Sequence, residues 1–217
     1  FGTVNKVIST KELIEKKTLA NLKIDSLILG YKEQECKDVK NLKYADEMDY
    51  IVTHKKRLSF ITNLLGNVKG NVLVLYQFVE KHGKPLYDTI KEKYKNRNVF
   101  FVSGSVDALD REKIREISEK TNNVVIVASY GTFSTGINIK NLHNIIFSSP
   151  SKSKIRVLQS IGRGLRLNDN KEMCKLFDIA DDLTYKGKQN FTLRHFMERI
   201  NIYNEEQFDY TIHRINI

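Results

Sequence analysis

Short apolar runs alternate with amphipathic segments through most of the chain. Five of these runs are rich enough in apolar residues to be strands buried on both faces of a sheet. They cover residues 71–79, 98–102, 123–128, 144–148 and 173–179. Between them apolar residues recur at helical spacing, as Leu86, Ile90 and Tyr94 do. Strands that alternate with helices predict crossover connections and a parallel sheet with helices on both faces, which is an α/β fold.

The two ends of the chain depart from this rhythm. Residues 23–31 predict a further strand, and the charge crowded into residues 32–43 favours a linker or a surface loop. Residues 45–65 predict a helix that ends near a glycine. Towards the C-terminus, Thr192 is expected to cap a helix, and residues 208–217 predict a final strand.

The composition of the chain limits the kinds of molecule that it is expected to bind. The chain has 36 Lys and Arg residues against 26 Asp and Glu residues, a formal net charge of +10 that favours nucleic acid or phosphates. No apolar run approaches the ~20 residues of a membrane span, and the first ten residues lack the apolar core of a signal peptide. Cys36 and Cys174 lie far apart, and the five histidines show no metal-ligand spacing. We therefore expect a cytoplasmic protein without a membrane partner or a metal site of its own.

Residues 155–166 bring together the most distinctive side chains. In a continuous helix, Gln159, Arg163 and Arg166 fall at positions i, i+4 and i+7 on one face. Apolar residues at the other positions, Ile155 among them, can face a core. Guanidinium groups are always charged and fork towards phosphate oxygens, so this spacing suggests a clamp for the terminal phosphates of a nucleotide. Taken alone, the cluster would favour a basic, solvated helix end.

Small polar residues follow the predicted strands. In an open parallel sheet ligands bind at the carboxyl ends of the strands, and the helix with the two arginines starts from this edge as well. Gln77 follows the first of the five strands, residues 103–105 the second and residues 129–138 the third. Such loops offer backbone N–H groups and hydroxyls to phosphates. An ordinary tight turn explains residues 103–105 equally well, whereas residues 129–138 are far more than a turn requires.

The order of these motifs resembles the second RecA-like domain of superfamily-two helicases. Residues 159–166 reproduce the family's Q-x-x-G-R-x-x-R motif, and residues 128–138 resemble its Thr/Ser-rich motif that ends in glycine. Residues 101–111 resemble the family's strand, glycine turn and Arg-bearing helix, and residues 72–83 its opening motif. The likeness runs from Phe1 to the C-terminus and is greatest to helicases of T4-type phages.

The resemblance implies roles for individual residues. Arg163 and Arg166 would be arginine fingers that reach the γ-phosphate of ATP, and Gln159 would position them or contact the nucleotide. Gly136 and Asn138, the latter where many relatives carry Asp, would contact the ribose or the γ-phosphate. Part of the nucleic-acid track would be lined by Gln77, Ser103, Gly104, Ser129, Tyr130 and Thr132.

Half of an ATP site is missing from the sequence. We find neither a G-x-x-x-x-G-K-[ST] phosphate loop nor an Asp-Glu box after a strand. ATP and its Mg²⁺ would then be held mainly by a preceding N-terminal RecA-like lobe. Residues 1–40 would be the exit of that lobe and the interlobe link, and residues 41–217 the C-terminal RecA-like helicase domain.

The resemblance further implies an ATP-dependent DNA helicase of which this chain is one lobe, inactive when alone. Its expected substrates are branched and single-stranded DNA and RNA–DNA hybrids, unwound or branch-migrated in recombination, repair and replication. Two alternatives remain at this point. The chain could be a stand-alone, non-catalytic nucleic-acid-binding module with a RecA-like fold, or part of a duplex DNA translocase that does not unwind.

Overall fold

Seven parallel strands form one sheet in the computed structural model, which describes residues 10–132, 139–151, 153–167 and 171–217. The strand order is β3-β4-β2-β5-β6-β1-β7, and every hydrogen-bonded pair in it is parallel. The strands are β1 (Asn21–Gly30), β2 (Val72–Tyr76), β3 (Asn98–Val102), β4 (Val124–Ser129), β5 (Asn144–Phe147), β6 (Met173–Asp182) and β7 (Tyr210–Asn216). The predicted parallel α/β sheet and its C-terminal strand are confirmed.

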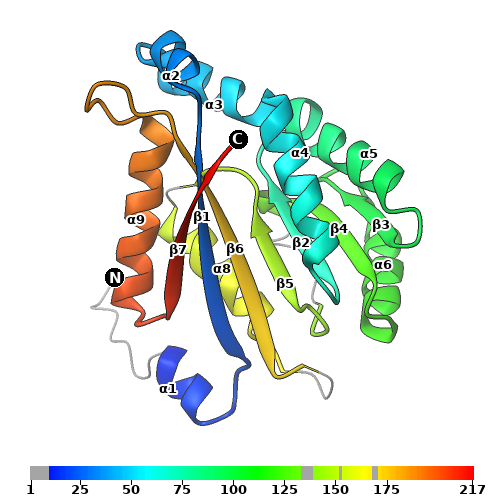
Figure 1. Cartoon of the computed structure of the whole chain (residues 1–217). Helices are drawn as coiled ribbons and strands as arrows, with labels where there is room; N and C mark the ends of the chain where they lie inside the picture. The colour runs from blue at the N-terminus through cyan, green and yellow to red at the C-terminus, as the bar shows by residue number, and fades with distance from the viewer. Residues whose placement is uncertain (1–9, 133–138, 152, 168–170) are drawn as a thin grey trace, which may run out of the picture.

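Helices cover both faces of this sheet (Figure 1). Helices α4 and α5 pack on one face, and α6, α8 and α9 pack on the other. The helical segments are α1 (Thr10–Glu15), α2 (Glu33–Val39), α3 (Tyr44–Thr53), α4 (Lys55–Leu64), the 3-10 turn η1 (Leu65–Asn67), the π-turn η2 (Val79–Gly83), α5 (Lys84–Lys93), α6 (Ala108–Lys120), α8 (Lys154–Gly164) and α9 (Phe191–Glu205).

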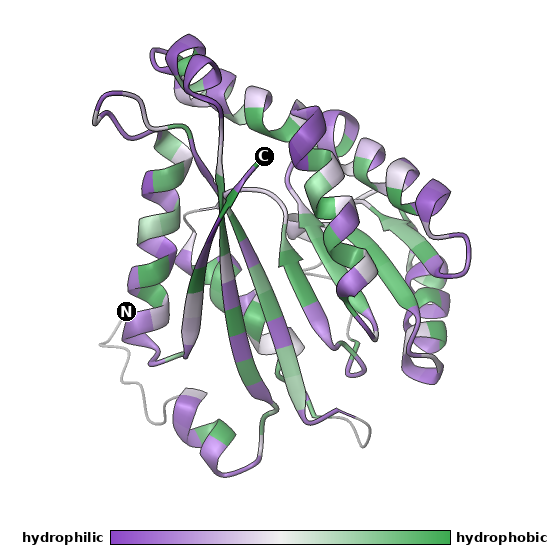
Figure 2. Ribbon diagram, in the orientation of Figure 1, coloured by the Kyte–Doolittle hydropathy of each residue, from purple (hydrophilic) through white to green (hydrophobic). Residues whose placement is uncertain are grey.

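The central strands are buried on both sides, as their apolar runs predict. In β2, Leu73 and Leu75 face the cluster that includes α8 and α9, whereas Val72 and Val74 face the cluster of α4 and α5. Strands β2 and β4 are hydrophobic along almost their whole length, whereas the helices carry mixed faces (Figure 2). Burying one such Val or Leu side chain contributes about 1.5–3 kcal/mol, so the sheet is a firm base for the loops at its edges.

Two predicted elements differ in the structure. The expected linker at residues 32–43 contains the helix α2, whose Cys36 and Val39 are buried against Ile51 and Leu183. The expected helix at residues 45–65 is two helices, α3 and α4, separated at His54, which has an extended backbone. In both places a few tertiary contacts decide the outcome, and hydrophobic spacing along the chain does not report them.

The residues before position 40 contribute a strand to the sheet. Strand β1 pairs with β6 from Asn21↔Met173 to Gly30↔Asp182, and with β7 on its other side. Residues on both sides of the predicted division at residue 40 therefore belong to the same sheet. The role of residues 1–40 as a link to a preceding lobe stays a prediction.

The start of α9 is capped from another helix. Thr192 was expected to cap it, but the helix begins at Phe191 with Asn190 at the N-cap position. The carboxylate of Glu47, in α3, accepts hydrogen bonds from the backbone N–H groups of Phe191 at 2.9 Å and Thr192 at 2.7 Å. A carboxylate is favourable at a helix N-terminus, so Glu47 performs the capping and ties α3 to α9.

Candidate functional sites at the two edges of the sheet

Helix α8 carries the arginine motif and is held to the sheet by its apolar side. Ser153 caps it by accepting a hydrogen bond from the backbone N–H of Arg156 at 3.4 Å, and Val157 and Ile161 are buried. The opposite side leaves Gln159 exposed and Arg163 half-buried. Ile155, which was expected to be able to face the core, is 69% exposed, because this first turn projects beyond the packed surface.

The helix ends sooner than the motif does. Its last residue is Gly164, and Arg166 lies beyond the C-cap at Leu165. The predicted single helical face of Gln159, Arg163 and Arg166 is therefore wrong for its last member. A side chain at position 164 would meet the strands, since a Cβ there would lie 2.6 Å from Cδ1 of Ile145.

The direction of α8 places the two arginines at the amino edge of the sheet. The helix starts after the carboxyl end of β5 and runs back to the beginning of β6. Its eleven residues rise by about 16 Å, which is enough to cross from one edge of the sheet to the other. At that end, the backbone carbonyl of Leu165 accepts a hydrogen bond from Ala20, just before β1. Arg163 and Arg166 thus stand at the opposite edge from the polar strand ends.

Three cationic side chains gather at this amino edge. Burial lowers the pKa of the Arg163 guanidinium, and the neighbouring charge of Arg166 lowers it further. Nη1 of Arg166 is buried and has no hydrogen-bond partner among the described residues. Lys171 is 3% exposed, and burial lowers the pKa of its amine. The cluster, named here the amino-edge cluster (Arg163, Arg166 and Lys171), can attract an anion.

The hydroxyl and glycine residues lie at the carboxyl edge, where β3, β4, β2 and β5 end side by side. Oγ of Ser103 lies 2.7 Å from Oγ of Ser105, and Gly104 between them is exposed. Oγ of Ser129 lies 2.7 Å from Oγ1 of Thr132 and accepts a hydrogen bond from its backbone N–H at 3.1 Å. These pairs fix compact turns in which Gly104 and Ser105 are exposed and Ser129 is half-buried, whereas the side chains of Ser103 and Thr132, predicted to line the track, are buried at 6% and 7% exposure.

Gln77 joins them through a buried anchor that the sequence did not reveal. The backbone N–H of Gln77 donates to Oγ of Ser149 at 3.1 Å, and Nδ1 of His82 lies 2.8 Å from the same oxygen. Burial, and then the charge of Arg57, lowers the pKa of His82 to about 3, so the ring is neutral at physiological pH. The exposed Gln77 side chain therefore stands on a rigid base.

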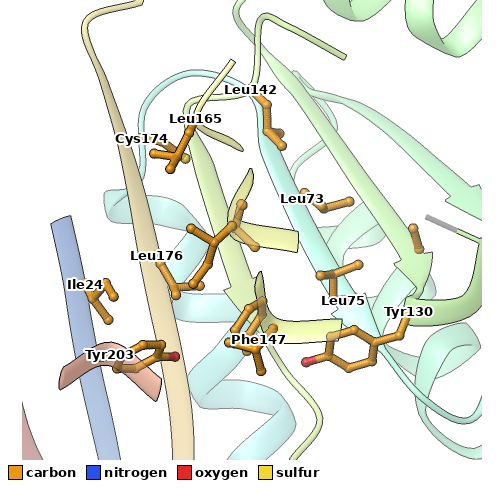
Figure 3. Packing of buried hydrophobic residues seen from close by; sticks show 14 of the residues in the cluster. Ile24, Leu73, Leu75, Tyr130, Leu142, Phe147, Leu165, Cys174, Leu176 and Tyr203 are labelled. Carbon is orange, nitrogen blue, oxygen red and sulfur yellow. The ribbon is translucent and has the colours of Figure 1, made fainter. Parts of the chain in front are cut away.

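Tyr130 does not line this surface with its side chain. The ring is 5% exposed and packs in the core 5.9 Å from the ring of Phe147, and both point into the apolar cluster in Figure 3. Its hydroxyl donates to the backbone carbonyl of Ser149 at 3.0 Å. The predicted contact of Tyr130 with nucleic acid is thus corrected for the side chain, because a large aromatic ring at this position completes the core.

Two predicted nucleotide contacts, Gly136 and Asn138, lie outside the described residues. The chain leaves the carboxyl edge at Thr132 and is described again from Ile139. The next residue, Lys140, offers its backbone carbonyl to the amine of Lys171 at 2.9 Å, at the amino edge. The motif that contains residues 129–138 therefore starts at one edge of the sheet and is followed by residues at the other.

In the part of the chain that the structure describes, no group of three or more His, Cys, Asp or Glu side chains could hold a metal ion. None of the described helices is both long enough and apolar enough to cross a membrane.

Comparisons with known proteins agree with this architecture. Residues 56–168 match the family described as helicase conserved C-terminal domain. The chain is 35% identical over 230 residues to the ATP-dependent DNA helicase uvsW of Enterobacteria phage T4, covering all of this chain and 45% of that protein. The chain thus spans less than half of this relative's length.

Solved structures give the same picture. The crystal structure of T4 UvsW matches with a TM-score of 0.78 at 36% identity, over 92% of this chain and 42% of that one. The DNA-bound ATP-dependent Type ISP restriction-modification enzyme LlaBIII matches with a TM-score of 0.63 at 15% identity, over 97% of this chain and 16% of that one. The second likeness shows a shared fold alone.

Proposed function

The chain belongs to the helicase conserved C-terminal domain family, the second RecA-like domain of superfamily-two helicases, and from that premise we propose that it is the C-terminal motor lobe of an ATP-dependent DNA helicase. In this proposal the parent protein unwinds or branch-migrates branched DNA and RNA–DNA hybrids during recombination, repair and replication. Its proposed place of action is the cytoplasm, which is that of the host cell if the protein is phage-encoded.

The amino-edge cluster is the observation that carries the proposal. Arg163 and Arg166 stand close enough for the charge of one to depress the pKa of the other. A buried N–H of Arg166 has no partner among the described residues, and a phosphate oxygen would accept a strong, charge-assisted bond from it. As arginine fingers, the pair would stabilise charge on the transferring phosphoryl group, an effect of ~10³–10⁵ in rate.

The rest of the nucleotide site belongs to the proposed N-terminal lobe. That lobe would hold most of ATP and its Mg²⁺, which would neutralise charge on the phosphates. From this chain, Gln159 would contact the nucleotide or steer the arginines, and Gly136 and Asn138 would contact the ribose or the γ-phosphate. Closure of the cleft around ATP would then bring the amino-edge cluster to the phosphates.

The carboxyl edge is proposed as this lobe's share of the nucleic-acid track. Gln77, Gly104 and Ser129 are at least partly exposed there and would offer amide, backbone and hydroxyl donors, which suit phosphates and sugars. Ser103 and Thr132, by contrast, are buried and would need the turns to shift before they could contact the strand. Contacts of this kind do not read base sequence. We therefore expect weak sequence preference and a strong dependence of DNA affinity on salt concentration.

The decisive variants are Arg163→Ala and Arg166→Ala in the full-length parent protein. Each should lower DNA-stimulated ATP hydrolysis by about 10³-fold, because the transition state loses a guanidinium, while DNA affinity stays unchanged. Arg156→Ala is the matched control, since Arg156 lies exposed in the same helix. Undiminished turnover in either finger variant would refute the assignment.

A second experiment tests the division of the motor into two lobes. This chain alone, with or without branched DNA, should show no steady-state ATP hydrolysis but should bind DNA in a salt-sensitive way. Turnover above background would mean that a complete nucleotide site lies in these residues. Strand displacement on forks, Holliday junctions and R-loops by the full-length protein distinguishes a helicase from a translocase that does not unwind.

A further inference from the structure

Lys171 is a lysine in a place where lysines are rare. Its side chain is 3% exposed, two residues before β6 begins. Removing a charged amine from water is costly unless partners replace the water. Among the described residues no carboxylate forms an ion pair with it, and the charge of Glu119 offsets only part of the effect of burial on the pKa of the amine. Its direct hydrogen-bond partners are therefore groups of another kind.

Two backbone carbonyls are the hydrogen-bond partners of this amine. Nζ of Lys171 donates to the carbonyl of Gly164 at 2.8 Å and to the carbonyl of Lys140 at 2.9 Å. Gly164 is the last residue of α8 and stands between Arg163 and Arg166. The amine therefore ties three segments together, which are the end of α8, the residues before β5 and the residues before β6.

This arrangement suits a helix end that must not fray. The last carbonyls of a helix lack partners within the helix and carry partial negative charge, which a cation stabilises. The C-terminal end of α8 also determines the direction of the two arginine side chains, since Arg163 is in its last turn and Arg166 follows its C-cap. Anchoring the carbonyl of Gly164 restricts both side chains at their bases.

We propose that Lys171 is the positioning residue for the two arginine fingers, fixing the end of α8 so that Arg163 and Arg166 meet the phosphates when the cleft closes. The inference rests on the proposed function of those arginines. Lys171 acts through them and touches no reacting atom. Because small misplacements of catalytic groups have large effects on rate, its contribution belongs to turnover rather than to binding.

The test compares Lys171→Met and Lys171→Gln in the full-length protein, with Lys175→Met as control. Lys175 lies exposed in β6, four residues further on. We expect the kcat of DNA-stimulated ATP hydrolysis to fall by about 10²-fold in the Met variant and by less in the Gln variant, which keeps a donor. The KM for ATP and the DNA affinity should stay within about twofold. Whichever variant folds, an unchanged kcat overturns the inference.

A combined variant separates positioning from general stability. In a protein that already carries both Arg163→Ala and Arg166→Ala, adding Lys171→Met should cause no further loss of kcat, because both groups that Lys171 positions are gone. A further loss of similar size, with altered KM and DNA affinity, would mean that Lys171 is only structural. Full turnover in Arg163→Ala alone would instead refute the proposed function, so the two failures are distinguishable.

Discussion

The buried side chain of His82 helps to fix Gln77, one of the residues of the proposed DNA track. His82 is 2% exposed, and its Nδ1 lies 2.8 Å from the Ser149 hydroxyl that also receives the backbone N–H of Gln77. Because burial keeps the ring neutral in the folded protein, the folded state resists the proton that the unfolded chain accepts. The carboxyl edge should therefore be sensitive to acid.

Lowering the pH should expose this sensitivity. The pKa of His82 falls from 6.5 to about 3 on folding. The neutral, buried ring therefore costs no stability above pH 6.5, and the free energy of unfolding falls progressively as the pH drops from 6.5 towards 3. The free energy of unfolding should drop by about 2 kcal/mol from this histidine between pH 6.5 and about pH 5. Denaturant titrations across this range measure it. His82→Gln should remove that part of the slope, and the exposed His213→Gln should not.

At the scale of the element, α8 ends where its backbone meets the strands. Gly164 has no room for a side chain, since a Cβ would lie 2.6 Å from Cδ1 of Ile145 and 2.7 Å from Sγ of Cys174. At Gly162, two residues earlier, an added Cβ would meet nothing within 4 Å. Two glycines in one helix therefore serve different purposes.

Alanine at the two positions should have opposite effects on stability. Gly164→Ala overpacks the contact with β5 and β6 and should lower the free energy of unfolding by about 1–3 kcal/mol. Gly162→Ala adds helix propensity without a clash and should raise it by about 0.5–1 kcal/mol. Thermal and denaturant melts of this chain measure both. Equal effects would mean that the helix end is not packed as described.

What the sequence could predict follows from how local each signal is. The continuous apolar runs predicted β2, β4 and β5 well, because burial on both faces leaves a mark along the chain itself. Helix α2 was missed because most of its residues are charged or polar and only Cys36 and Val39 are buried. Lys171 was missed because it is one of 36 Lys and Arg residues and binds backbone carbonyls, which leave no trace in composition.

At the scale of the whole molecule, buried charges join the layers. Nε of Arg199, in α9, donates to both carboxylate oxygens of Asp178 in β6 at 2.9 Å, and Nη1 donates to the carbonyl of Ser151 at 2.9 Å. The hydroxyl of Tyr203 donates to the same carboxylate. One ion pair thus links α9, the sheet and the approach to α8.

Breaking that pair from one side should be costly. Arg199→Met leaves Asp178 buried without its partner, so the free energy of unfolding should fall by about 3–5 kcal/mol. Lys84→Met removes an exposed pair with Glu80 and should change stability little, because solvent screens such pairs. Denaturant unfolding of the two variants gives the comparison. Similar losses in both would contradict a special role for the buried pair.

The place of β1 in the sheet has a consequence for how the chain is made. It lies between β6 and β7, and Asn21 pairs with Met173 while Ile24 pairs with Tyr210. On a ribosome that adds roughly 5–20 residues per second, β1 waits on the order of ten seconds for either neighbour. Both its edges stay open to foreign strands during that interval, so the strand of this sheet that comes first in chain order is among the last to be secured.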